Sequence, residues 1–386
     1  VHNDLALLIG AKEPETAVSH YEKALQIAPN FTLALNNWGN MLLELERYEE
    51  ARQKYQKALQ IRPGDEYAWY NLARLAELEN QPEEAERCYL RAMENSPNNS
   101  HIPNNLGLLF AGLGRDTDAE SQYRKALEID SENPLPHNNL GQLLESRGDL
   151  EGARRCYEDA LELKPAFLVA LNNLADLLVQ TGKSDEAETY FQRALEVEPD
   201  NGDVHNSYGF YLFNRGNEEA ARTHFLTALE HIPEFPLALN NLGNLELKQG
   251  NLDEAENCYL KALEIFNDDP AAHFNLGRLY LLKKKRDKAL DYFEILVQKF
   301  GANAEVLSEA ATFLASKKES NAASKLYEAV LMVDPENVDT RFNLARILFH
   351  EKKEAAKALE HLRKIEDISP DYPGLQREIA LVGDSL

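Results

Sequence analysis

The feature that most constrains this 386-residue chain is a pattern that returns every 34 residues. An alanine recurs at that spacing, an aromatic residue follows four positions later, and a second alanine follows three positions after the aromatic. The aromatic positions are Tyr21, Tyr55, Tyr89, Tyr123, Tyr157, Phe191, Phe225, Tyr259, Phe293 and Tyr327. Self-similarity at a fixed period of this length indicates stacked repeats rather than one globular core.

Each repeat has the pattern of two helices. Apolar residues in its first half recur at helical spacing, as in Leu35, Trp38 and Leu42. A short polar turn leads to a second helix whose first turn is rich in acidic residues, which complement the positive end of the helix dipole. A proline such as Pro63 closes most repeats, because it lacks the amide hydrogen that would continue the helix. We expect small residues of the first helix to lie opposite the recurring alanines of the second: Gly39, Ala73, Gly107, Gly141, Ala175, Gly209, Gly243 and Gly277.

This combination of period and residue columns resembles the tetratricopeptide repeat family over essentially the whole chain. The resemblance implies an all-α fold, a right-handed α-solenoid of stacked antiparallel helix pairs. We count about eleven repeats over residues 1–372, the first of them truncated. Residues 373–386 are expected to form a capping helix and tail that shield the last apolar face.

Composition narrows the range of partners. The formal net charge of −24 disfavours nucleic acid, because phosphate binding needs clustered lysine and arginine. No run approaches the roughly 18 apolar residues that span a bilayer, so no membrane span is expected. The first residues lack the basic segment and cleavage site of a signal peptide, and we expect a cytoplasmic protein.

Amide side chains form the most regular polar feature. We number columns within a repeat so that residues 32–65 fill columns one to 34. In the resembling family the sixth column faces a concave groove formed by the first helices. Here that column holds asparagine at Asn37, Asn71, Asn105, Asn139, Asn173, Asn241 and Asn275, and the preceding column adds further amides, among them Asn138 and Asn172.

Asparagine suits the recognition of an extended chain. Its side chain offers one acceptor and two donors, enough to pair with both the N–H and the C=O of a ligand backbone. First helices of adjacent repeats should lie roughly 10 Å apart, which matches about three residues of extended peptide at about 3.3–3.6 Å each. The alternative is that these amides cap or brace neighbouring helices, and the sequence leaves both interpretations open.

Four further residues are candidates for partner contacts. Phe210 and Phe213 fall on groove columns and could anchor an apolar ligand side chain, or could pack against the next repeat. Arg74 and Arg278 share the ninth column and could pair with acidic ligand groups, or with the acidic residues of neighbouring repeats.

Catalytic and metal-binding patterns are missing from the sequence. There is no glycine-rich phosphate loop, zincin motif or nucleophile elbow. Cys88, Cys156 and Cys258 lie whole repeats apart, too far for a disulfide or a shared metal ion. We therefore predict no enzyme activity and no cofactor.

The sequence favours a non-catalytic scaffold that binds a protein or peptide segment in the groove through its asparagine row. The amide row, with phrases such as "SPNN" and "IPEF" between repeats, is similar to the repeat domain of O-linked N-acetylglucosamine transferases. That similarity implies a first alternative, a substrate-recruiting module of a larger enzyme such as a glycosyltransferase. A second alternative is a scaffold that self-associates through its end repeats.

Overall fold

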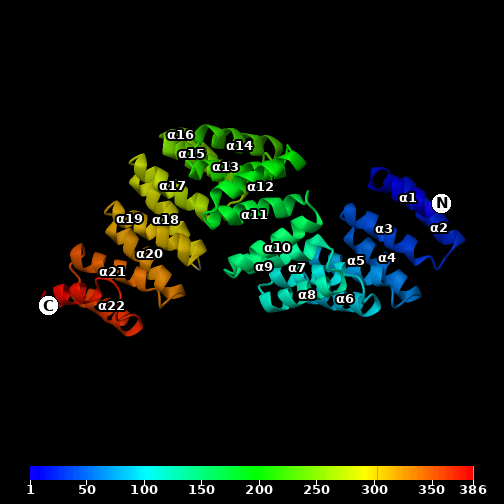
Figure 1. Ribbon diagram of the computed structural model, residues 1–386, viewed down its shortest axis with the longest axis horizontal. Coiled ribbons are helices and arrows are strands. Elements are labelled where there is room, and N and C mark those ends of the chain that lie inside the picture. The colour runs from blue at the N-terminus through cyan, green and yellow to red at the C-terminus, as the bar shows by residue number, and fades with distance from the viewer. Residues whose placement is uncertain (302, 386) are drawn as a thin grey trace. The chain divides into compact units, whose positions relative to one another are not determined.

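The computed structural model of the protein describes residues 1–301 and 303–385. These residues divide into two compact units, Val1–Val197 and Glu198–Leu386. The described residues form helices and no strand, so the expected all-α fold class is confirmed. Figure 1 shows the first helix of a repeat lying beside its second helix, as α19 lies beside α20.

The helices alternate strictly along the chain. The first helices are α1 (His2–Ile9), α3 (Thr32–Glu44), α5 (Glu66–Leu78), α7 (His101–Gly112), α9 (Pro134–Ser146), α11 (Leu168–Gln180), α13 (Gly202–Asn214), α15 (Pro236–Gln249), α17 (Pro270–Leu282), α19 (Ala304–Ser316) and α21 (Val338–His350). The second helices are α2 (Pro14–Ile27), α4 (Tyr48–Ile61), α6 (Pro82–Asn95), α8 (Asp116–Ile129), α10 (Leu150–Leu163), α12 (Ser184–Val197), α14 (Glu218–His231), α16 (Leu252–Ile265), α18 (Arg286–Phe300), α20 (Ser320–Val333) and α22 (Ala355–Ile368). A 3₁₀ turn, η1 (Gly10–Lys12), follows α1, and α23 (Leu375–Gly383) follows α22.

The turn inside each repeat depends on one residue in the left-handed backbone region. That residue is glycine in five consecutive repeats, from Gly114 to Gly250, where the absence of a side chain makes the conformation easy. In other repeats the same column holds Glu46, Asn80, Lys284 or Lys318, each with a φ of about +60°. The recurrence of this turn brings the second helix back along the first.

The core of each repeat forms where an aromatic ring of the second helix lies on the small residue of the first. A Cβ added to Gly141 would lie 2.6 Å from Cε1 of Tyr157, and one added to Gly243 would lie 2.5 Å from Cε1 of Tyr259. At Gly209 such a Cβ would also lie 3.3 Å from the carbonyl oxygen of the recurring Ala221, in agreement with the expected position opposite the alanines. The aromatic residue four positions later needs the space, because its ring is too large to fit beside a side chain at the same distance.

Several of the buried tyrosines also reach a polar partner on the first helix. The Tyr157 hydroxyl donates to Glu145 at 2.7 Å, and the Tyr259 hydroxyl donates to Asn244 Oδ1 at 2.8 Å. A buried hydroxyl without a partner is destabilising, so these contacts satisfy each ring at its polar end. One consequence is that several polar residues of the first helices are already engaged by the core.

Unit 2 contains a histidine pair between α13 and α14, in which His205 is buried and His224 is half-buried. His205 Nε2 lies 2.8 Å from the Pro199 carbonyl oxygen, and its Nδ1 lies 2.8 Å from Nδ1 of His224. Because a carbonyl can only accept, Nε2 of His205 carries the proton and its Nδ1 accepts from His224. Burial, with a further contribution from His205, lowers the pKa of His224 to about 4.

This pair predicts a stability that falls as the solution is acidified. The folded-state pKa of His224 lies below its ordinary value of 6.5, so its contribution is complete above that pH and is lost as pH falls toward 4. Each pKa unit corresponds to about 1.4 kcal/mol, which gives a loss on the order of 2–3 kcal/mol. Urea unfolding between pH 7 and pH 4 should show a shallower decline for His224→Gln than for the wild type. The exposed His101, changed to Gln, is the control, and an equal decline in all three proteins would contradict the assignment.

Candidate functional site

The predicted groove residues lie on one face of the first helices, which we call the first-helix face. It is made of columns two, five, six, nine, twelve and thirteen, which share a side because they recur at spacings of three or four residues. Asn37, Asn105, Asn139, Asn172, Asn173 and Asn241 are half-buried there, whereas Asn71, Asn138 and Asn275 are buried. The two groups therefore differ in how much of the amide a partner could contact.

The central amides of unit 1 form a continuous hydrogen-bonded chain. Asn173 Nδ2 donates to Asn138 Oδ1 at 3.0 Å, and Asn138 donates to its neighbour Asn139 at 3.4 Å. Asn139 Nδ2 donates to Asn104 Oδ1 at 2.9 Å, and Asn104 donates to Asn105 at 3.2 Å.

The hydrogen-bonded chain of amides ends where Asn105 Nδ2 donates to the Tyr70 hydroxyl. It thus crosses α11, α9, α7 and α5, and each bond between two helices is donated to the helix on the N-terminal side. Bonds connected in this way polarise and strengthen one another.

The remaining predicted amides are placed less uniformly. Asn37 donates to Asn3 at 3.1 Å and Asn241 donates to Asn206 at 2.9 Å, which repeats the bridge to the preceding first helix. Asn172 donates to Asp176 within α11. Asn275 accepts a long bond from Arg278, and Asn71 is buried beneath the face.

These contacts show that the amides brace adjacent helices, which was the alternative left open by the sequence. Bracing does not use the whole amide. A bridging asparagine such as Asn173 donates one N–H to its neighbour, and its half-buried side chain retains a second N–H and an acceptor oxygen. Binding of a partner backbone to those groups remains a prediction.

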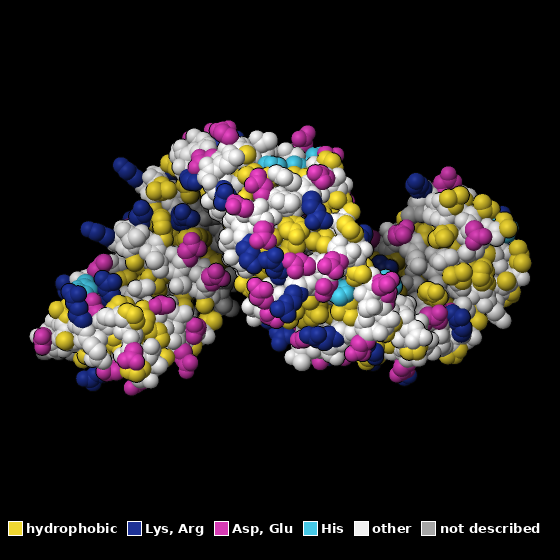
Figure 2. Space-filling model, in the orientation of Figure 1, with side chains coloured by type: hydrophobic (Ala, Val, Ile, Leu, Met, Phe, Trp, Pro, Cys, Tyr) yellow, Lys and Arg dark blue, Asp and Glu magenta, His cyan; other side chains and the backbone are white. Residues whose placement is uncertain are grey.

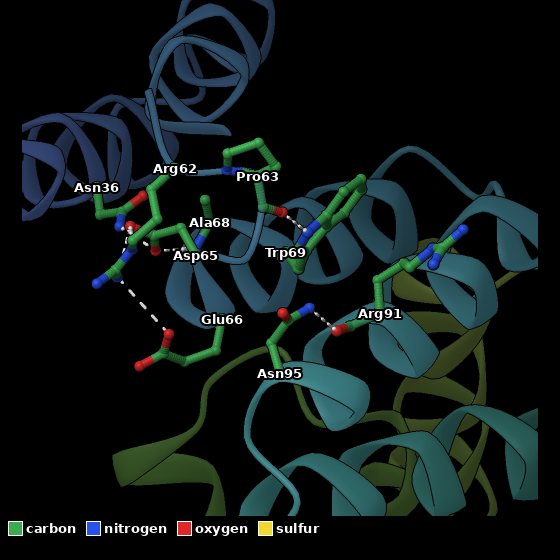
Figure 3. A network of polar contacts seen from close by, with 9 residues as sticks. All are labelled: Asn36, Arg62, Pro63, Asp65, Glu66, Ala68, Trp69, Arg91 and Asn95. Carbon is green, nitrogen blue, oxygen red and sulfur yellow. Dashed lines mark hydrogen bonds and ion pairs between the residues drawn. The ribbon is translucent and has the colours of Figure 1, made fainter. Parts of the chain in front are cut away.

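The fifth-column amides of α3 and α15 form a different kind of bridge. The buried Asn36 donates to Asp65 Oδ1 at 3.0 Å, and Asp65 caps α5 by accepting from the Ala68 backbone N–H (Figure 3). Arg62 adds an ion pair at 2.7 Å. Burial alone would raise the pKa of the Asp65 carboxyl, but hydrogen bonds from Thr32, Ala68 and Asn36 and the charge of Arg62 keep it below its usual value.

The same arrangement recurs in unit 2, where Asn240 donates to Asp269, the N-cap of α17. The fifth column can therefore tie its helix to the start of the next first helix.

The other candidates are also on the first-helix face. Phe210 is 45% exposed, and Phe213 is half-buried with Lys248 Nζ 4.8 Å above its ring. Arg74 is exposed, and Arg278 lies beside the rings of Phe274 and Phe313. Among the described residues, neither arginine forms an ion pair, so the alternative of a salt bridge to a neighbouring repeat is not what the structure contains.

Sequence reasoning missed a row of exposed apolar side chains in the second column. These side chains lie one turn before the amides and therefore beside them. The sequence signal was an apolar residue where the packing columns do not require one. The row consists of Leu33 (45% exposed), Tyr67 (55%), Leu135 (38%) and Val169 (47%) in unit 1 and Leu237 (55%) in unit 2.

Other kinds of site are not formed by the described residues. They contain no group of three or more histidine, cysteine, aspartate or glutamate side chains arranged for a metal ion. None of their helices combines the length and the apolar character that crossing a membrane requires. Acidic and basic side chains are intermixed on the face seen in Figure 2.

Comparison with known protein families finds repeat families along most of the chain. Residues 6–209 match the family described as the Cilia and flagella-associated protein 70 C-terminal domain. Residues 234–294 and 314–373 match two families described as tetratricopeptide repeat. No curated protein matches the chain.

Solved structures show the same fold at low sequence identity. Yeast Tom70 is 17% identical with a TM-score of 0.51, over 97% of this chain and 92% of Tom70. A monomeric mutant of IFIT1, solved with Gppp-AAAA, is 16% identical with a TM-score of 0.55, over 87% of this chain and 90% of that one. At these identities the likeness concerns the fold alone.

The amide chain predicts a loss of stability when it is interrupted. Asn139→Ala removes the donor to Asn104, whose buried oxygen then lacks a partner, and we expect a loss of about 1–3 kcal/mol in the free energy of unfolding. Urea denaturation measures this loss. Gln142→Ala changes an exposed amide of the same helix and should be nearly neutral. Equal stability of the two variants would mean that the bridges do not hold the helices together.

Proposed function

We propose that this chain, which belongs to the tetratricopeptide repeat proteins, is a non-catalytic scaffold that binds an extended segment of a partner protein along the first-helix face. Its residues 6–209 match the family of the Cilia and flagella-associated protein 70 C-terminal domain. The coarser part of this conclusion, a protein-interaction scaffold, follows from the repeat family itself. The finer part concerns which surface binds and through which side chains.

One observation carries the choice of surface. In unit 1 the exposed apolar side chains of Leu33, Tyr67, Leu135 and Val169 stand beside the half-buried amides of the sixth column. Exposed apolar groups in a row that is bordered by polar groups are typical of interaction surfaces. The apolar side chains would take up side chains of the partner, and the unused amide N–H and C=O groups would pair with its backbone.

The spacing of the row fits an extended occupant. First helices of adjacent repeats are separated by roughly 10 Å in packed helices, and an extended chain covers that distance in about three residues. A partner would therefore present one apolar side chain to each repeat. A long strip of weak, repeated contacts of this kind favours a segment over a folded surface.

Two alternatives remain compatible with the same surface. A substrate-recruiting module of a larger enzyme, such as a glycosyltransferase, would present bound segments to a catalytic domain elsewhere in its chain, and the sequence of the whole gene would reveal that domain. A scaffold that self-associates through its end repeats would show a mass that rises with concentration in light scattering.

Binding should depend on the apolar row. A randomised 12-residue peptide library, displayed on phage and selected on the whole chain, supplies the ligands. Changing Leu135 and Val169 together to Gln should weaken the selected peptides about tenfold or more, which is ~1.4 kcal/mol or more, because each change removes a buried contact. Isothermal titration calorimetry measures the dissociation constants.

The matched control changes Leu90 and Leu163 to Gln. They are 42% and 40% exposed but lie on the second helices α6 and α10, so binding should be unchanged. A library that selects no peptide, or peptides that bind the first variant as well as the wild type, would rule out this surface.

A further inference from the structure

Unit 2 has a hollow on the first-helix face that differs chemically from the rest of the chain. It has a volume of about 470 Å³ and is lined by Phe213, Asn244, Leu247, Lys248, Arg278 and Leu282, which come from α13, α15 and α17. Two of these six side chains are cationic and none is acidic. In a chain with a net charge of −24, a hollow lined in this way is a local reversal of charge.

Arg278 is held in position by its neighbours. Its guanidinium carbon lies 5.3 Å from the centre of the Phe274 ring and 5.5 Å from the centre of the Phe313 ring, within the range of cation–π attraction. Its one hydrogen bond among the described residues is a long contact of 3.5 Å to Asn275. A guanidinium held by rings and lacking a carboxylate partner is prepared to receive an anion, because little side-chain freedom remains to be lost.

Two more donors border the same hollow. Asn244 accepts from the Tyr259 hydroxyl through Oδ1, so its amide nitrogen is left to donate. Lys248 pairs with Glu218 at 3.0 Å, and its ammonium group also lies over the Phe213 ring. Lys248 therefore makes the electrostatic potential of the hollow more positive, although its ammonium group already has a carboxylate partner. Three side chains that carry N–H donors therefore line this hollow, and its remaining lining side chains are apolar.

A second hollow limits what can bind beside the first. It has a volume of about 720 Å³ and is lined by residues of α19, including Glu305, Glu309 and Phe313. Phe313 also contacts Arg278, so the two hollows are neighbours on the same face. The acidic lining of the second hollow disfavours a run of acidic residues and is compatible with a single anionic group.

We propose that Arg278, Asn244 and Lys248 form a subsite for one anionic side chain of a bound peptide, with Phe213, Leu247 and Leu282 receiving an adjacent apolar residue. The shared chemistry is a planar or tetrahedral oxyanion, supplied by aspartate or glutamate or by a phosphorylated residue. The guanidinium fork pairs with either kind of group through two N–H donors. This subsite rests on the proposed function, since it selects among segments that lie along the first-helix face.

The test uses the whole chain and hexapeptides of sequence Gly-Ser-Xaa-Leu-Ser-Gly, in which Xaa is Asp, Asn or phosphoserine. Isothermal titration calorimetry measures the dissociation constant of each protein and peptide. NMR of the arginine side-chain N–H groups shows whether the peptide contacts Arg278, whose signal is identified by its disappearance in Arg278→Gln. We expect the Asp peptide to shift this signal and to bind about tenfold or more tightly than the Asn peptide, as a charge-assisted bond requires. The phosphoserine peptide shows whether phosphate or carboxylate is preferred.

Two variants separate the anion subsite from general binding. Arg278→Gln should bind the Asp and Asn peptides equally, and Arg278→Lys should keep part of the preference because it retains the charge without the fork. Arg346→Gln is the matched control. Arg346 occupies the same column of α21 and lies 3.8 Å from Glu378, so its loss should leave the preference intact. Thermal unfolding of each variant establishes that it is folded.

The outcomes distinguish this subsite from the scaffold function. An Asp peptide that binds no more tightly than the Asn peptide, or a preference that persists in Arg278→Gln, overturns the subsite. Library peptides that still depend on Leu135 and Val169 would then leave the proposed scaffold function in place. If the preference for the Asp peptide and the dependence of library peptides on Leu135 and Val169 are both absent, the scaffold function is overturned as well.

Discussion

The packing of an aromatic ring of each second helix against a small residue of the preceding first helix is the contact on which the rest of the structure depends. In six repeats a methyl group added to that glycine would lie within 3 Å of the ring, so the helices approach as closely as their backbones allow. Close approach sets the position of the first helix, and with it the direction of every side chain on the first-helix face. The tyrosine hydroxyls complete the arrangement by bonding to polar residues of that same helix.

Amides on the first helices then serve two purposes at once. They connect neighbouring repeats through hydrogen bonds such as Asn139 to Asn104 and Asn173 to Asn138. They also lie at the border between the buried interface and the solvent, because a bridging side chain is only half-buried. A repeat protein has few contacts between distant parts of its sequence, so bonds between adjacent repeats contribute much of its cooperativity. The same row can meet a partner with the groups that bridging leaves unused.

The electrostatics of the chain are local rather than uniform. Acidic residues begin many of the second helices, and some acidic residues pair with arginines of the next repeat, as Glu86 does with Arg115 and Glu120 with Arg147. Arg278 departs from that pattern because it contacts two aromatic rings and no carboxylate among the described residues. A charge that the fold leaves without a counter-ion is the natural place for a partner to supply one.

The sequence by itself determined the repeat architecture. The period, the alanine and aromatic columns and the closing prolines follow directly from what helix pairs need in order to stack, and these expectations agree with the helices observed. The sequence also identified the row of amides and Arg278 as candidates for partner contacts. Such features are readable because they depend on local spacing, which a linear sequence preserves.

Only the tertiary structure decided how those residues are used. Whether Asn173 bonds to a neighbouring helix, whether Arg278 meets a carboxylate or two rings, and whether Leu135 remains exposed all depend on side chains from adjacent repeats. The column of a residue gives the face of its helix but not the distance to the next helix or the rotamers found there. Hydrogen bonds and ion pairs form over about 3 Å, and that precision is set by the packing of neighbouring repeats rather than by the repeat pattern.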